Sequence, residues 1–346
     1  MRRRLILPGL LAVLLLAALG YGFYWHLAAR ALEEGVARWA AERRAEGYHV
    51  AYAGPTIGGF PFRLEARFDD PVIEAPPSGG TWRWRGPTIQ GEAAPWRPLR
   101  IAFSVPGRHA LSWDAAGRRR DLHVDADAAN GTVEIAPDGR LEAFGATLTD
   151  LTIGAAPDRP IAVAKATATA TFAAPLAADH DRGSVAFDVS IDGLVLPPSE
   201  DPPLGRGIQH ITASGALMGR IPPGPPEQAL RRWRDDGGTL ELRGLAIDWG
   251  PFHLTGEGTF TLDQAMRPLA AMTATISGHG ETLDALVAKG VVPPREGGIA
   301  RLLLTAMSRT PEDGSPPRID VPLTAQDGFL HVGPLKLIPL PAIGWP

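Results

Sequence analysis

The chain has 346 residues with a formal net charge of −4, and its 40 glycines and 34 prolines exclude a helical bundle or a coiled coil because neither residue tolerates helix interiors. A hydrophobic share of 45% is too high for wholesale disorder, and the acidic balance offers no electrostatic footprint for nucleic acid. Without cysteine there is no disulfide, no thiolate zinc site and no cysteine nucleophile.

The N-terminus predicts a membrane anchor. Three arginines at residues 1–4 precede an uncharged run, residues 5–25, which as a helix would rise roughly 31 Å, about one hydrocarbon core. The arginines are expected to stay cytoplasmic, which places the rest of the chain across the membrane. Leu5 and Leu16 would lie in the span, with Tyr21 and Trp25 at the far interface. The alternative is a cleaved signal peptide, and both readings export the body.

Residues 26–46 predict an amphipathic stalk helix, because apolar side chains recur at spacings of three and four. Gly47 is a plausible stop. Residues 47–346 form the exported body, with a possible internal boundary at the proline cluster of residues 222–226.

Most of the body alternates apolar and polar residues with a period of two, which is typical of half-buried strands. Asn-Gly at residues 130–131 and Asp-Gly at residues 138–139 and 192–193 predict turns. Strands are expected at residues 60–68, 82–85, 122–127, 133–135, 141–153, 161–172, 185–191, 208–218, 240–249, 252–262, 269–277, 319–325 and 329–337, and short helices at residues 227–235, 282–289 and 294–309. The predicted fold is therefore mainly β, with long curved antiparallel sheets forming a groove or a sandwich.

Motifs that carry chemistry are missing from the sequence. It contains no G-x-S-x-G, H-E-x-x-H or G-x-x-x-x-G-K. His123 with Asp125 and Asp127 on one strand face, and His180 between two aspartates, are read as solvated polar groups. Arg118–Arg120 and the arginines around Trp233 are read as solvated basic faces that can also touch anionic lipid. We therefore expect no catalytic, cofactor or metal site.

Aromatic and aliphatic side chains on the alternating strands are candidates for an apolar groove. Trp82, Trp84, Trp96 and Trp113 are dense within a short stretch, which fits either core packing or an apolar binding wall. The candidate groove residues are Phe60, Phe62, Leu64, Phe68, Trp82, Trp84, Phe252, Leu254, Phe260 and Leu262.

Three stretches in this order carry a resemblance to a known family: Gly-Phe-Pro-Phe-Arg at residues 59–63, Trp-Arg-Pro at residues 96–98, and Leu-x-Gly-x-Gly-x-Phe-x-Leu-Asp at residues 254–263. The chain resembles the bacterial domain-of-unknown-function family 2125, grouped with the AsmA-like proteins. That resemblance implies a β-rich periplasmic protein anchored in the inner membrane, with a part in outer-membrane assembly or phospholipid transport. It implies no catalytic residues.

The combined expectation is a single-pass protein of the bacterial inner membrane with its N-terminus cytoplasmic and its body periplasmic. It would be non-enzymatic and would bind membrane lipid or another apolar ligand in a β-sheet groove, serving envelope maintenance or lipid transport. Alternation is the same for an open groove and a closed core, so a scaffold that recruits envelope proteins is the alternative. A hydrolase with a dispersed site, using His123 or His180, is a remote one.

Overall fold

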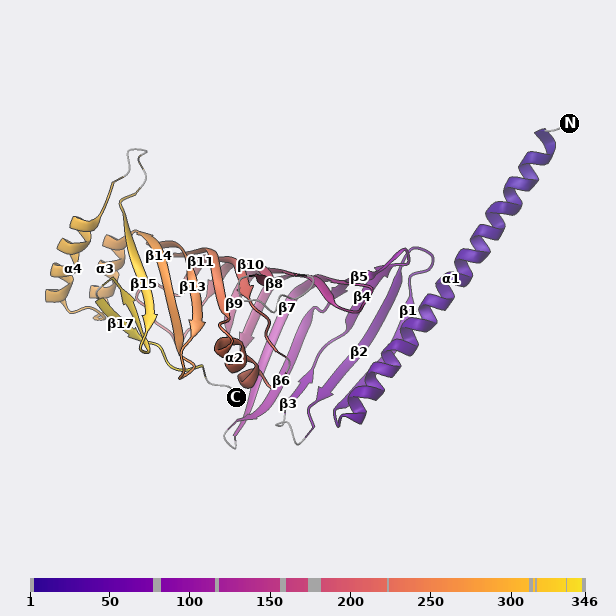
Figure 1. Ribbon diagram of the computed structural model, residues 1–346, viewed down its shortest axis with the longest axis horizontal. Coiled ribbons are helices and arrows are strands. Elements are labelled where there is room, and N and C mark those ends of the chain that lie inside the picture. Colours follow the sequence, from indigo (N-terminus) through magenta and orange to yellow (C-terminus); the bar gives the residue numbers. More distant parts are fainter. Residues whose placement is uncertain are drawn as a thin grey trace. The chain divides into compact units, whose positions relative to one another are not determined.

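The computed structural model describes residues 3–76, 82–115, 118–155, 160–173, 182–222, 224–310, 314, 316–333 and 335–343. For residues 3–12, 115, 226 and 335–338 it describes the backbone alone. The chain is mainly β and its described strand pairs are antiparallel, as the alternation predicted (Figure 1). It divides into two compact units, which we call unit 1 (Met1–Arg140) and unit 2 (Leu141–Pro346). The predicted boundary at residues 222–226 lies inside unit 2.

Helix α1 (Arg3–Ala45) joins the expected anchor and stalk into one continuous helix, whose C-terminal part lies along β1 and β2 while its N-terminal part extends beyond them (Figure 1). The helix ends at the predicted glycine. Gly47 adopts φ +91°, and the backbone amides of Gly47 and Tyr48 donate hydrogen bonds back to carbonyls of the last helical turn. Gly47 N–H donates to the Arg44 carbonyl at 3.0 Å, and Tyr48 N–H donates to the Arg43 carbonyl at 3.0 Å. Across the described residues, we find no helix with the length and apolar character needed to cross a membrane.

Unit 1 forms one antiparallel sheet in which two short strands repeatedly stand opposite one long strand. β3 and β4 pair with the two halves of β2, and β5 and β6 pair with the two halves of β7. The pairs β1–β2, β3–β6 and β4–β5 complete the sheet. The strands are β1 (His49–Gly58), β2 (Leu64–Glu74), β3 (Trp82–Arg85), β4 (Ile89–Ala94), β5 (Arg97–Ser104), β6 (Gly107–Ala115) and β7 (Arg118–Ile135).

Two local predictions in unit 1 are wrong. The strand expected over residues 60–68 begins only at Leu64, because residues 59–63 form the turn between β1 and β2. Asn130-Gly131 is not a turn: both residues lie inside β7, opposite Ser104 and Phe103 of β5. Partners along the whole length of β7 override the local turn preference. The Asp138-Gly139 turn is confirmed, with Gly139 at φ +85° and its N–H donating to the Ala136 carbonyl at 2.9 Å.

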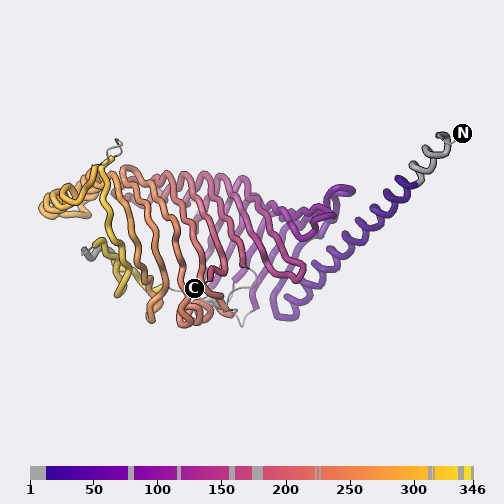
Figure 2. The backbone as a smooth tube through the Cα atoms, turned by 45° about the horizontal axis from the view of Figure 1, so that its top comes forward, coloured from indigo at the N-terminus to yellow at the C-terminus, as the bar shows by residue number. Residues whose placement is uncertain are grey.

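Unit 2 is an antiparallel meander in which each strand pairs with the next along the chain (Figure 2). Asp192-Gly193, expected to be a turn, lies inside β10. The strands are β8 (Leu141–Gly154), β9 (Ile161–Phe172), β10 (Gly183–Val195), β11 (Gly207–Met218), β12 (Thr239–Trp249), β13 (Phe252–Leu262), β14 (Pro268–Ser277), β15 (Arg318–Gln326), β16 (Phe329–Val332) and β17 (Leu335–Pro339).

Three short helices of unit 2 lie close to the predicted ranges: α2 (Pro226–Asp235), α3 (His279–Ala288) and α4 (Pro294–Met307). α2 is fixed by Trp233, which is 4% exposed and whose indole N–H donates to the Met218 carbonyl at 2.8 Å. α3 packs against α4 and against β13. Leu304 of α4 and Val332 of β16 pack on the buried cluster of the sheet described below.

The hairpin between β13 and β14 is closed by an aspartate. The Asp263 carboxylate accepts hydrogen bonds from the backbone N–H groups of Ala265 and Arg267, at 2.8 and 2.9 Å, and from Arg267 Nε at 2.7 Å. Burial raises the pKa of Asp263, but the bonds and charge of Arg267 outweigh it and hold the pKa below its ordinary value. The carboxylate therefore has to stay ionised for the turn to keep its full set of bonds.

Candidate functional site

The sheet of unit 2 has one apolar and one polar face. Cross-strand partners share a face, so the register places an unbroken apolar row across β8 to β15. We call the face that carries it the apolar sheet face. The row is Leu148, Ala166, Ile191, Ile211, Ile247, Leu254, Ile276 and Ile319.

A β-bulge keeps this face apolar along β12. The register shifts between Leu242 and Leu245, so that Arg243 and Gly244 together occupy the place of one residue. Leu245 and Ile247 follow Leu242 by three and five residues, so in a strand without the bulge they would point to the opposite face from Leu242. The bulge therefore preserves the chemical difference between the two faces.

Side chains of the apolar row are more buried on β13–β15 than on β8–β12. Leu254, Ile276 and Ile319 are 8%, 9% and 3% exposed, and they form a cluster on which α4 and β16 pack. Ile211 and Ile247, and the row's members on β8 to β10, are only half-buried. The described helices thus cover the β13–β15 end of the apolar sheet face more completely than the β8–β12 part.

Small residues on the apolar sheet face mark places where strands and large side chains come close. A Cβ on Gly258 would lie 2.4 Å from the Ala271 carbonyl oxygen and 2.6 Å from Met272 Cα. A Cβ on Gly215 would lie 2.2 Å from the Glu241 carbonyl oxygen. These glycines are required because any side chain there collides with the backbone of the next strand.

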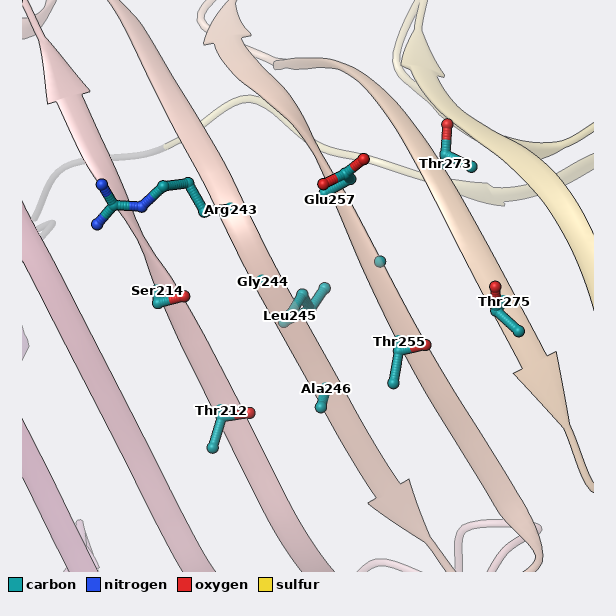
Figure 3. A pocket seen from close by; sticks show the side chains of 11 residues that line it. Thr212, Ser214, Arg243, Gly244, Leu245, Ala246, Thr255, Glu257, Thr273 and Thr275 are labelled. Carbon is teal, nitrogen blue, oxygen red and sulfur yellow. The ribbon is translucent and has the colours of Figure 1, made fainter. Parts of the chain in front are cut away.

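The opposite face of unit 2 carries hydroxyl and charged groups. Thr212, Thr255 and Thr275 belong to one of its rows, and Figure 3 shows them lining a hollow of about 470 Å³ with Arg243 and Glu257. Farther along the same strands, two His–Asp pairs follow one another. His210 Nδ1 lies 2.5 Å from Asp192 Oδ1, and His253 Nδ1 lies 2.7 Å from Asp248 Oδ1. Water can satisfy the hydrogen-bonding groups of such a face, so no second layer of structure has to pack on it.

Unit 1 exposes three aromatic side chains at the tips of two hairpins. We call Phe60, Phe62 and Trp96 the aromatic tip; they are 56%, 70% and 63% exposed. The two phenylalanines belong to the turn between β1 and β2. Trp96 belongs to the two-residue turn between β4 and β5, beside the buried Pro95. Exposed aromatic groups at this density on neighbouring turns indicate a contact surface.

Helix α1 binds both hairpin tips through one turn of aromatic residues. Tyr21 donates a hydrogen bond to the Pro61 carbonyl, and Trp25 Nε1 donates to the Arg63 carbonyl at 2.8 Å. Tyr24 donates to the Pro95 carbonyl at 2.8 Å. These bonds fix the aromatic tip at the level of residues 21–25 of the helix.

A hollow of about 460 Å³ lies beside the aromatic tip. It is lined by Phe62 and Trp96, by alanines, by Arg63, Arg97 and Arg100, and by Glu92 and Thr132. Arg63 pairs with Glu92 at 3.0 Å and Arg100 with Glu134 at 3.2 Å, whereas Arg97 has no ion-pair partner among the described residues.

The predicted anchor residues take different places. The side chain of Leu5 lies outside the described residues. Leu16 is 69% exposed, and the other large apolar side chains of α1 from Val13 to Leu19 are also exposed. Trp25 is 6% exposed and packs with Leu64, and Tyr21 lies near Phe60 with ring centroids 6.5 Å apart. The aromatic groups expected at the interface therefore also hold α1 on the sheet.

The predicted groove residues do not share one environment. In unit 1, Phe68 meets Tyr52 with ring centroids 5.6 Å apart, and Trp82 meets Tyr48 at 6.3 Å. Trp84 stacks on His109 at 5.9 Å. In unit 2, Leu254 is buried in the cluster under α4, Phe252 packs against it, and Phe260 and Leu262 are half-buried on β13. Prediction missed the half-buried members of the apolar row on β10–β12, namely Ile191, Ile211 and Ile247.

The groups considered for chemistry stay apart. Asp125 pairs with Arg108 at 3.2 Å, and within the described residues no three His, Asp or Glu side chains gather closely enough to hold a metal ion. His180 lies outside the described residues. Arg234 bonds to the Asp263 carbonyl at 2.8 Å and so secures α2 on the β13–β14 hairpin.

Fold and surface together define a mainly β protein whose antiparallel strands carry an apolar face and whose long N-terminal helix is packed against its first hairpin. The chain belongs to the family described as "Uncharacterized protein conserved in bacteria (DUF2125)", whose model matches residues 25–341. No curated protein and no solved structure matches the chain.

Proposed function

We propose that this chain is an envelope protein of the bacterial inner membrane that binds lipid or another apolar ligand along the apolar sheet face of unit 2. It is non-enzymatic and AsmA-like in this proposal, its body is periplasmic, and it serves envelope maintenance or lipid transport. The observation that carries the proposal is the fall in burial along the apolar row. Ile276 and Ile319 are buried, whereas Ile191 and Ile211 continue the row as half-buried side chains, and Ile247 is half-buried where it packs against the cluster.

Such a surface needs a partner of matching chemistry. Half-buried isoleucines in adjacent strands form a continuous apolar strip. Each Å² of this strip that a ligand removes from water stabilises the protein–ligand complex by about 25 cal/mol. Acyl chains suit a long strip because they offer length and no polar atoms. The polar face of the same sheet, with its threonines and His–Asp pairs, offers them nothing.

Membrane anchoring is the second part of the proposal. Residues 5–25 contain no charged residue, arginines precede them, and the described side chains from Val13 to Leu19 are solvent-exposed apolar groups. With the arginines cytoplasmic, the body lies on the far side of the membrane.

Native mass spectrometry of the full chain purified from a bacterial host in mild detergent tests ligand binding. We expect co-purifying phospholipid, and Ile211→Glu should lower its occupancy at least about tenfold, because a carboxylate against acyl chains costs about 2 kcal/mol or more. Thr212→Glu is the matched control, since it is the next residue on β11 and faces the polar side. It should keep the lipid.

Ile191→Glu, on the neighbouring strand in the same row, serves as a second variant if Ile211→Glu fails to fold. A folded wild-type chain without lipid, or equal occupancy in the Ile211 and Thr212 variants, would overturn the proposal. The alternative would then lead: a scaffold that recruits envelope proteins, favoured by the apolar side chains of Leu302 and Ile299 on α4, which are 75% and 63% exposed.

A further inference from the structure

We propose that the hollow between Arg63, Arg97 and Arg100 binds the phosphate headgroup of an anionic phospholipid in the bilayer, with the aromatic tip of unit 1 inserted beside it. The inference rests on the membrane anchoring proposed above and adds a lipid-binding site that is separate from the apolar sheet face. It commits to one ligand source, the membrane surface.

The position of the aromatic tip along α1 carries the first step. Residues 21–25 end the uncharged run that is proposed to span the membrane. Hydrogen bonds from Tyr21, Tyr24 and Trp25 hold both hairpin tips at that level. Phe60, Phe62 and Trp96 therefore lie where the hydrocarbon meets the headgroups, which is where amphipathic aromatic rings are most favourable.

Charge carries the second step. The hollow of about 460 Å³ is lined by Phe62 and Trp96, by three alanines, by Arg63, Arg97 and Arg100, and by Glu92 and Thr132, so arginines outnumber carboxylates in its lining. Two of the arginines are paired with glutamates, at 3.0 and 3.2 Å, which leaves the Arg97 guanidinium as the positive charge in excess among the described residues. A planar guanidinium binds phosphate through two parallel hydrogen bonds. A lining that combines apolar side chains with an excess of positive charge matches a glycerophospholipid, whose phosphate adjoins its acyl chains.

The three arginines of the hollow come from two places in the chain that only the fold brings together. Arg63 ends the β1–β2 turn, and Arg97 and Arg100 lie on β5, directly after the Trp96 turn. Their side chains are exposed, with fractions of 62% for Arg63 and 58% for Arg100. Although Arg63 and Arg100 are ion-paired, these side chains lie at the protein surface, where a membrane headgroup can reach them.

A single fluorescent label tests the docking. The chain has no native cysteine, so Leu99→Cys, at 41% exposure between Arg97 and Arg100, accepts one label next to the hollow. The full chain is reconstituted in nanodiscs of phosphatidylethanolamine and phosphatidylglycerol that contain a lipid spin-labelled near its headgroup. We expect strong quenching at position 99, and weak quenching of a control label at Arg83→Cys in the same unit, whose 44% exposed side chain lies at the end of β2 away from the aromatic tip.

Arg97→Gln in the Leu99→Cys background should lower the ratio of docked to undocked tip about fivefold, the usual effect of one arginine near an anionic surface. Arg295→Gln, an exposed arginine of α4 in unit 2, is the matched control and should leave the ratio unchanged. Replacing phosphatidylglycerol with phosphatidylcholine should reproduce the Arg97→Gln effect.

An unquenched label at position 99, or quenching that ignores both Arg97→Gln and lipid charge, would overturn the inference. Saturable binding of inorganic phosphate to the protein in phosphatidylcholine nanodiscs, abolished by Arg97→Gln, would also overturn it by identifying a free-anion site. The proposed function fails differently. Loss of incorporation into nanodiscs reports on the anchor, and loss of co-purified lipid in Ile211→Glu reports on the apolar sheet face, whereas Arg97→Gln should alter neither.

Discussion

Replacing Trp25 with alanine is expected to release helix α1 from unit 1. The Trp25 indole is 6% exposed, packs on Leu64, and meets Phe60 edge-on with ring centroids 5.4 Å apart. Its N–H also donates to the Arg63 carbonyl at 2.8 Å. Truncating a buried tryptophan to alanine typically costs 3–5 kcal/mol, which is about two to four orders of magnitude in a local opening equilibrium.

Two further variants distinguish the apolar packing of Trp25 from its hydrogen bond and from a general effect of removing a tryptophan. Trp25→Phe keeps most of the apolar contact and loses the indole N–H, so it should cost only about 1 kcal/mol. Trp39→Ala is the matched control on the same helix: Trp39 is 45% exposed, and its loss should change stability by no more than about 0.5 kcal/mol.

Hydrogen exchange of the full chain, followed by mass spectrometry, measures the effect segment by segment. In Trp25→Ala, amides of β1 and β2 should exchange faster, and amides of β10–β14 should be unchanged because unit 2 has contacts of its own. Equal protection of β1 and β2 in the Trp25→Ala and Trp39→Ala variants would refute the packing of α1 by this residue.

Two further predictions concern unit 2. Asp263→Asn should destabilise it by about 1 kcal/mol at pH 7 through the lost charge-assisted bonds to Arg267. The pKa of Asp263 is lower in the folded state than in the unfolded state, so the carboxylate contributes to stability above about pH 4. This contribution is lost as pH falls through the folded pKa, and the urea midpoints of Asp263→Asn and wild type should therefore converge near pH 2. A difference between the two midpoints that stays constant with pH would contradict this. Gly258→Ala should lower the free energy of unfolding by about 1–3 kcal/mol and the urea midpoint with it, since its Cβ would meet the Ala271 carbonyl oxygen at 2.4 Å. Gly298→Ala on α4, where a Cβ meets nothing within 4 Å, should be neutral or stabilising. Equal midpoints for the two alanine variants would refute the close approach at Gly258.

Regular alternation over a strand's full length predicted strands well. The strands at residues 161–172 and 252–262 were predicted with the bounds that β9 and β13 have. Residues 252–262 place an apolar residue or glycine at every second position, and residues 166–171 alternate alanine with threonine; a strand puts such alternating residues on one face. For the same reason the mainly β class was clear from the sequence.

Predictions that depended on turn chemistry fared worse. Asn130-Gly131 and Asp192-Gly193 have the residues of tight turns, yet both lie inside strands. Gly193 uses its positive φ of +63° within β10, and the neighbouring residues stay paired to β9 and β11. Local preference for a turn loses when long partners on either side offer a full ladder of hydrogen bonds.

The aromatic tip could not be predicted because it depends on contacts between distant residues. Tyr24 and Pro95 are 71 positions apart, and nothing local in either segment indicates the bond between them. The residues themselves were visible as short motifs, at 59–63 and 96–98, but their common place at one level of α1 follows only from the fold. Exposure of Phe62 at 70% likewise contradicts the half-buried position that alternation gave it.

Alternation is the same for an open groove and for a closed core, so burial along a single row is the observation that separates them. If a second layer closed the sheet evenly, Ile211 and Ile247 would be as buried as Ile276, because all three point to the same side in one register. Ile211 is half-buried, and Ile247 is half-buried although it packs against the cluster that Ile276 and Ile319 form under α4 and β16. The gradient supports a ligand of apolar chemistry over the β8–β12 part of the face, and this is why a charge at Ile211, and not at the covered Ile276, is the discriminating change.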